Sequence, residues 1–114
     1  MCYFNLVLKS LEPLGIRQAV LTSQDGLVIE SAGNSSPEPE LLAAELATLL
    51  RNSQALSKSL GGSPKRFSLA TEQREVLAVV FGRYCLGAVV DRTADRKSVG
   101  NELSRLALRL AKTL

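Results

Sequence analysis

Histidine and tryptophan are both absent from the 114-residue sequence. Without an imidazole group, the chain lacks the usual general base, the Ser-His and Cys-His nucleophile pairs and the ligand that most zinc sites use. The two cysteines, Cys2 and Cys85, are too few and too far apart for a metal cluster or a disulfide scaffold. We therefore expect no catalytic residue, no bound metal and two reduced thiols.

Motifs that hold a nucleotide or a cofactor are missing as well. Neither the phosphate-binding pattern Gly-x-x-x-x-Gly-Lys-Ser/Thr nor the pattern Gly-x-Gly-x-x-Gly occurs. Two pairs of carboxylates, Glu38 with Glu40 and Glu72 with Glu75, are expected in solvated positions, where acid–base catalysis is disfavoured. The sequence predicts no cofactor and no enzyme activity of its own.

Long apolar runs are also absent. The longest ones, Val76 to Phe81 and Leu86 to Val90, are strand-sized and fall short of the ~18 residues that a membrane-spanning helix needs. The N-terminus lacks the basic region with which a signal peptide begins. These features predict a cytoplasmic chain that makes no integral membrane contact.

Charge is present but unevenly placed. Residues 1–57 carry three basic against six acidic side chains, whereas residues 58–114 carry eleven against five. The net charge of +3 is modest and the aromatic content of 4% leaves few rings for base stacking, so the sequence favours a solvated basic surface without nucleic acid. Docking on nucleic acid or an anionic membrane is the alternative, through Arg96, Lys97, Arg105, Arg109 and Lys112.

The apolar pattern predicts a single domain that spans residues 1–114. A turn at Asp25-Gly26 predicts a hairpin, Ser36 is expected to cap the middle helix, and Gly61-Gly62 is expected to end it. A polar turn is expected at 72–75. The predicted elements are helix 5–14, strands 16–23 and 27–32, helix 38–60, strands 65–71, 76–81 and 84–90, and helix 96–114.

The predicted middle helix is apolar on more than one side. Leucines at 42, 46, 49, 56 and 60 form one stripe, and further leucines and alanines widen it. This surplus favours a second copy of the chain as partner, with deeper burial inside one monomer as the alternative. The alternating strand 65–71 is typical of a sheet edge, where another chain can pair. We predict a homodimer with an interface at Leu42, Leu46, Leu49, Leu50, Ser53, Phe67 and Leu69.

These features together resemble the roadblock / dynein light chain family over about residues 5–114. The resemblance rests on the hairpin from 15–21 to 25–29, the long Leu/Ala helix, the three following strands and the segment Ser98-Val99-Gly100-Asn101-Glu102-Leu103. It implies an α+β fold of roadblock/profilin type, in the order α-β-β-α-β-β-β-α. A five-stranded antiparallel sheet would carry the middle helix on one face and the terminal helices on the other. Family members dimerise through the middle helix and the third strand.

The resemblance also implies a function. Bacterial members of the family are commonly partners or activators of small Ras-like GTPases, so we expect a non-catalytic homodimeric regulator or adaptor that binds such a GTPase. Stimulation of GTP hydrolysis is a further expectation. Arg51 and Lys58, on the middle helix, are expected to contact acidic residues of the GTPase. The alternative is a structural dimerisation scaffold in a multiprotein assembly of cytoskeletal or motor type.

Overall fold

The structure, a computed structural model, describes residues 14–33 and 36–113. The helix expected at 5–14 therefore lies outside the described residues, apart from its last position. The described elements are β1 (Ile16–Ser23), β2 (Val28–Gly33), α2 (Pro39–Asn52), α3 (Gln54–Leu60), β3 (Arg66–Ala70), β4 (Arg74–Phe81), β5 (Tyr84–Asp91) and α4 (Arg96–Thr113).

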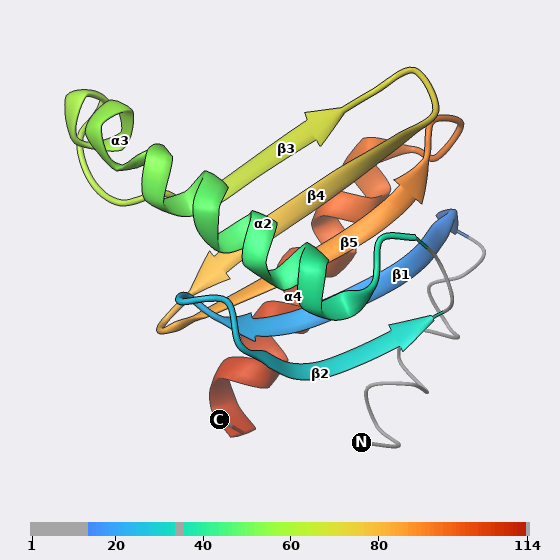
Figure 1. Ribbon diagram of the computed structural model, residues 1–114, viewed down its shortest axis with the longest axis horizontal. Coiled ribbons are helices and arrows are strands. Elements are labelled where there is room, and N and C mark those ends of the chain that lie inside the picture. Colours follow the sequence, from blue (N-terminus) through green and yellow to red (C-terminus); the bar gives the residue numbers. More distant parts are fainter. Residues whose placement is uncertain (1–13, 34–35, 114) are drawn as a thin grey trace.

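The strands form a five-stranded antiparallel sheet in the order β2-β1-β5-β4-β3. Helix α2 crosses one face of this sheet and helix α4 lies behind the other face (Figure 1). The predicted α+β fold is confirmed. The two strands with nearly continuous apolar sequence, β4 and β5, are interior strands, and β3 lies at an edge, as its alternating pattern predicts.

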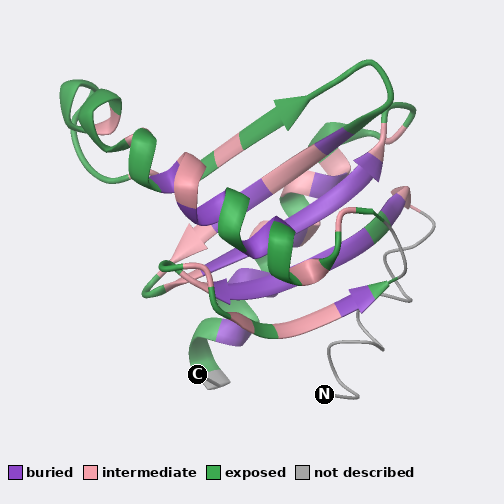
Figure 2. Ribbon diagram, in the orientation of Figure 1, coloured by how far each residue is buried: buried purple, intermediate pink, exposed green. Residues whose placement is uncertain are grey.

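Two apolar cores hold the layers together. Under α2, Leu42 and Leu46 pack against residues of β1, β4 and β5 such as Val20 and Val89. A larger core under α4 contains Val99 and Leu103 with the opposite faces of the same strands. The helix α2 approaches the sheet closely at Gly87, where an added Cβ would lie 2.5 Å from Leu46 Cδ1. Both faces of the central strands are therefore buried (Figure 2).

The middle helix is not continuous. It breaks at Ser53, which lies between α2 and α3, and the expectation of one helix over 38–60 is wrong on this point. The side chains of Ser53 and Gln54 both donate to the Leu50 carbonyl, at 2.8 and 3.1 Å, and so compete with the helical backbone hydrogen bonds. The buried residues of α2 end at Leu50, and α3 has none.

Two smaller expectations also need correction. Ser36 does not cap the middle helix, because the N-cap residue is Glu38 and its side chain makes no capping hydrogen bond. The turn expected at 72–75 is shorter, because β4 already begins at Arg74 and pairs Glu75 with Ala70 and Val90. The turns at Gly26 and Gly61, both with positive φ, lie where the sequence predicts them.

Candidate functional site

Helix α3 stands away from the body of the protein (Figure 1). None of its seven residues is buried, and its two leucines, Leu56 and Leu60, are 65% and 79% exposed. Figure 2 shows this helix almost entirely in the colour of exposed residues. A helix that buries none of its leucines gains no hydrophobic stabilisation from its own chain, so these two side chains are available to a partner.

An apolar groove runs between α2 and the β3 edge of the sheet. Its volume is about 310 Å³. Leu49 of α2 is half-buried in its wall, and Leu69 of β3 is 54% exposed beside it. Across the groove floor, Leu69 pairs with Val76 of β4. We call this hollow the α2–β3 groove; it is lined by Ser36, Pro37, Leu42, Glu45, Leu46, Leu49, Leu69, Thr71, Arg74, Glu75, Val76 and Val89.

Strand β3 has a free edge beside this groove. Within the described residues it pairs only with β4, and all its residues except Phe67 are exposed. Phe67 is half-buried against the core under α2. The free edge offers backbone donors and acceptors to an added strand, next to apolar side chains that it could cover.

The residues predicted for the dimer interface divide into two groups. Leu42, Leu46 and Leu50 are only 5%, 1% and 4% exposed, since they pack against the sheet of their own chain. That part of the set matches the alternative of burial within the monomer. Leu49, Ser53, Phe67 and Leu69 keep exposed surface, as do the two leucines of α3, Leu56 and Leu60.

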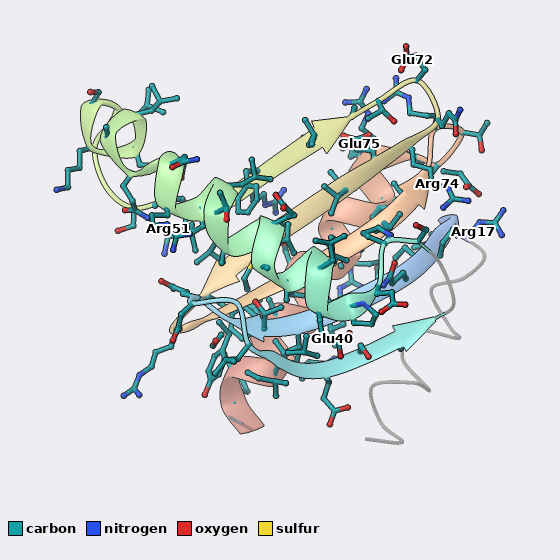
Figure 3. All side chains as sticks on the ribbon, viewed as in Figure 1. Arg17, Glu40, Arg51, Glu72, Arg74 and Glu75 are labelled. Carbon is teal, nitrogen blue, oxygen red and sulfur yellow. The ribbon has the colours of Figure 1, made fainter. Side chains whose placement is uncertain are left out.

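Arg51 and Lys58 are both exposed, on α2 and α3 respectively. Arg51 Nη2 donates to Thr48 Oγ1 at 3.4 Å, and the side chain lines a shallow hollow with Gln24 and Asp25 of the β1–β2 turn. Figure 3 shows Arg51 on the side of α2 that faces this turn. It is therefore on the opposite side of the helix from Leu49 and the α2–β3 groove.

Glu75 is buried, which corrects the expectation of a solvated carboxylate. Its side chain is 2% exposed, and its Oε1 lies 3.1 Å from Arg96 Nε and 3.6 Å from Arg92 Nη1. Figure 3 shows Glu75 near the β3–β4 turn, at the far end of the sheet from Arg51. The alternation of β4 points the Glu75 carboxylate to the α4 side of the sheet, although the residue also borders the α2–β3 groove. The strand predicted from the sequence begins at Val76 and so does not include Glu75.

Metal-ligating and nucleophilic side chains were sought among the described residues. Among residues 14–33 and 36–113, no group of three or more His, Cys, Asp or Glu side chains could hold a metal ion. Burial raises the pKa of the Cys85 thiol to about 11, which keeps it protonated at neutral pH and unreactive. In the same residues, no helix is long and apolar enough to cross a membrane.

Comparison with known families shows which family the chain belongs to. The model of the Roadblock/LC7 domain matches residues 4–91. The chain belongs to the Roadblock/LC7 family. Members of this family are generally regulatory or adaptor proteins. The groove, the free edge and the exposed helix therefore belong to a roadblock domain, and the resemblance seen in the sequence is confirmed.

Solved structures support the same fold. A Roadblock/LC7 domain from Streptomyces avermitilis is 20% identical, with a TM-score of 0.85 over 96% of this chain and 95% of that one. A structure of MglB in a tetrameric arrangement is 24% identical, with a TM-score of 0.85 over 94% and 84%. Profilin II from Acanthamoeba castellanii is 16% identical, with a TM-score of 0.65 over 90% of both chains. No curated protein sequence matches this roadblock domain.

Proposed function

We propose that the chain is a cytoplasmic, non-catalytic homodimer that binds a small Ras-like GTPase and stimulates its GTP hydrolysis. The observation that carries the proposal is the unpartnered apolar surface made by α3, the α2–β3 groove and the free edge of β3. Family membership adds a regulatory or adaptor role. The GTPase is the partner class that the resemblance to bacterial members implies.

The connection from α3 to β3 favours a two-fold dimer. Because only residues 61–65 separate the two elements, α3 stays near the start of β3. Antiparallel pairing of two β3 edges would bring the start of one strand beside the end of the other, where Leu69 lies. The partner's α3 would then reach the α2–β3 groove, and its two leucines could enter the space beside Leu49 and Leu69. Each copy would fill the other's groove.

Such a dimer would have a composite surface on its helical face. The two α2 helices would lie side by side, and a surface across the two-fold axis exists once per dimer. A GTPase that binds there would require two copies of the chain. Arg51 and Lys58 border the helical face as exposed cations and would steer acidic residues of the GTPase during encounter.

Stimulation of hydrolysis would come from rearrangement of the GTPase's own catalytic groups. A supplied arginine finger can raise phosphoryl transfer by roughly 10³-fold or more, but it must enter the nucleotide site of the partner. Arg51 lies on a helix beside the β1–β2 turn, where no extended loop presents it. Arg83 lies in the tight turn between β4 and β5. Neither position favours insertion into a nucleotide site.

The proposal is tested with a Ras-like GTPase from the same organism, loaded with either a fluorescent GTP analogue or fluorescent GDP. Anisotropy titration should show binding that is at least about tenfold tighter for the GTP form, and single-turnover hydrolysis of GTP should accelerate. Equal affinity for both forms would contradict the proposal. A stable dimer that binds neither form would support the alternative, a structural scaffold.

A further inference from the structure

A second apolar groove lies on the opposite face of the sheet from α2. It runs between α4 and the strands β3 and β4, and its volume is about 280 Å³. Leu108, on the outer side of α4, is 69% exposed in its wall. We call this hollow the α4 groove; it is lined by Lys65, Arg66, Val79, Val80, Phe81, Ser104, Ala107, Leu108 and Ala111.

The charges around the α4 groove have one sign. Lys65 and Arg66 form its sheet-side wall, and no acidic residue is among its lining residues. On the helix, Lys112 lies four residues after Leu108 and so occupies the same side of α4. Neither Lys65 nor Lys112 makes an ion pair within the described part of the chain. As far as residues 14–33 and 36–113 show, the groove is an apolar hollow with unpaired positive charge on both sides.

Arg66 is held in place within this groove. Its guanidinium donates to the hydroxyl oxygen of Ser104 and lies 3.7 Å from the position that a Cβ on Gly100 would take. A guanidinium has five N–H donors in a planar fork, and one hydrogen bond to a hydroxyl leaves the others for an acceptor. A carboxylate can take two of them at once, which adds geometric specificity to the charge attraction.

We propose that the α4 groove is the docking site for an acidic segment of a partner protein. Apolar side chains of that segment enter the hollow beside Leu108, and its carboxylates pair with Arg66, Lys65 and Lys112. The inference goes beyond the proposed GTPase function, because it concerns the other face of the sheet and requires neither nucleotide nor α2. It gives the domain a second contact through which it is recruited.

The shape and charge of the groove favour this occupant over two others. A membrane surface would need apolar side chains that project outward, whereas only Leu108 projects here and the other apolar lining forms a concavity that suits separate side chains. A second copy that presented its own α4 would bring Lys112 and Arg105 against the same basic walls, and like charges repel. The apolar side chains of an acidic peptide would fill the hollow, and its carboxylates would pair with the surrounding cations.

The experiment uses the whole chain and a display library of random linear peptides. We expect the selected peptides to be rich in Asp and Glu with two or more large apolar residues. Leu108→Asp should weaken their binding at least about tenfold, since it places a repelling charge in the hollow. Lys65→Glu and Lys112→Glu should each weaken it several-fold. All three side chains are exposed, and circular dichroism checks that the variants stay folded.

Arg109→Glu is the matched control. Arg109 is exposed on α4, but it follows Leu108 directly and so projects about 100° around the helix from it, whereas Lys112 lies one turn further along the same side. Arg109→Glu changes the net charge equally and should leave peptide binding within about twofold of the wild type. The proposal is overturned if no peptides are enriched, or if the selected ones bind all four variants equally. Tighter binding to phosphatidylserine-rich vesicles than to peptides, lost in Leu108→Asp, would overturn it in favour of a membrane.

Discussion

Glu75 Oε1 lies 3.1 Å from Arg96 Nε and thereby connects the start of β4 to the first residue of α4. The Glu75 side chain is 2% exposed, whereas that of Arg96 is 60% exposed. The buried carboxylate therefore depends on cations that reach it from solvent. Arg92, at 3.6 Å from the same oxygen, is the second such cation. These contacts hold the beginning of α4 against the sheet.

Removal of both cations should destabilise the fold. Arg96→Ala alone should lower the free energy of unfolding by about 1 kcal/mol, because Arg92 still faces the carboxylate. The double variant Arg92→Ala/Arg96→Ala should lower it by about 2–3 kcal/mol, since Glu75 is then buried without a partner charge. Chemical denaturation measures both values. Lys97→Ala, an exposed neighbour, should change stability by less than about 0.5 kcal/mol.

The cap of α4 should make the stability of the fold depend on pH in the acidic range. Ser98 Oγ donates to Asp95 Oδ2 at 2.7 Å, and the Lys97 backbone N–H donates to Oδ1 at 3.1 Å. The Ser98 hydrogen bond is the main cause that holds the pKa of Asp95 below its usual value. Because the folded-state pKa is the lower one, the stabilisation is present at neutral pH and is lost as the pH falls through it.

Asp95→Asn should therefore be less stable than the wild type at pH 7. The difference should shrink as the pH falls below the ordinary value of 3.8 and should disappear only below the lowered pKa of the folded state. Thermal unfolding of both proteins across this range measures it. A stability difference that stays constant with pH would show that the carboxylate charge contributes nothing to the cap.

Cys85 should resist alkylation, and it should make the stability of the fold decline at alkaline pH. Its thiol is buried, and that burial raises its pKa to about 11 from the ordinary 9.0. In the folded state iodoacetamide should not modify it at pH 8, whereas in denaturant it should react fully. The raised pKa means that stability is fully present below pH 9.0 and declines as the pH rises towards about 11. Cys85→Ala should remove that decline, although it is less stable at neutral pH because of the cavity.

A charge on α3 should dissociate the proposed dimer without unfolding the monomer. Leu56→Asp replaces a side chain that is 65% exposed within its own chain, so the monomer should keep its unfolding free energy within about 0.5 kcal/mol. The dimer dissociation constant should rise by about a hundredfold, because the charge would be buried against the partner. Sedimentation velocity checks this. Leu27→Asp, at a position 68% exposed in the β1–β2 turn, is the matched control and should stay dimeric.

Leu50, a predicted interface residue, is a poor position for a charge that tests the dimer. Leu50 is 4% exposed and packs inside its own chain, so Leu50→Asp should cost about 3 kcal/mol or more of folding free energy. Loss of the dimer in that variant would follow from unfolding. Circular dichroism should show the difference, with native helix content for Leu56→Asp and reduced content for Leu50→Asp.

Arginine variants test whether the chain supplies an arginine to the nucleotide site of the GTPase. Arg51→Ala, Arg74→Ala and Arg83→Ala are each compared with the wild type in single-turnover GTP hydrolysis. We expect each to keep at least about a third of the stimulation, with Arg51→Ala slowing association in a salt-dependent way. If one variant binds the GTPase normally yet abolishes stimulation, an arginine finger operates and the rearrangement mechanism is wrong.

The sequence predicts the fold well because the fold depends on local patterns. The Asp25-Gly26 turn, the apolar β4 and β5 and the glycine stop at Gly61 are each decided by a few adjacent residues. Apolar periodicity does not reveal the break at Ser53, because the break arises from two side chains that share the Leu50 carbonyl.

Apolar spacing also says little about which leucines of the stripe are buried. Apolar spacing identifies Leu46 and Leu56 as members of one stripe but does not reveal which side of a helix faces its own sheet. The structure buries the first and exposes the second, since α2 lies over the sheet and α3 stands away from it. The burial of Glu75 depends on its pairing with Arg96, a contact between residues that are distant in sequence.

The central claim, that the GTPase binds a surface that only the dimer has, is tested most directly by the mass of the complex. Light scattering during size-exclusion chromatography of the wild type with a GTP-analogue-loaded Ras-like GTPase should give two 12.3 kDa chains for each GTPase. The Leu56→Asp monomer should elute separately from the same GTPase. A complex with one chain per GTPase, formed equally well by wild type and Leu56→Asp, would contradict the account.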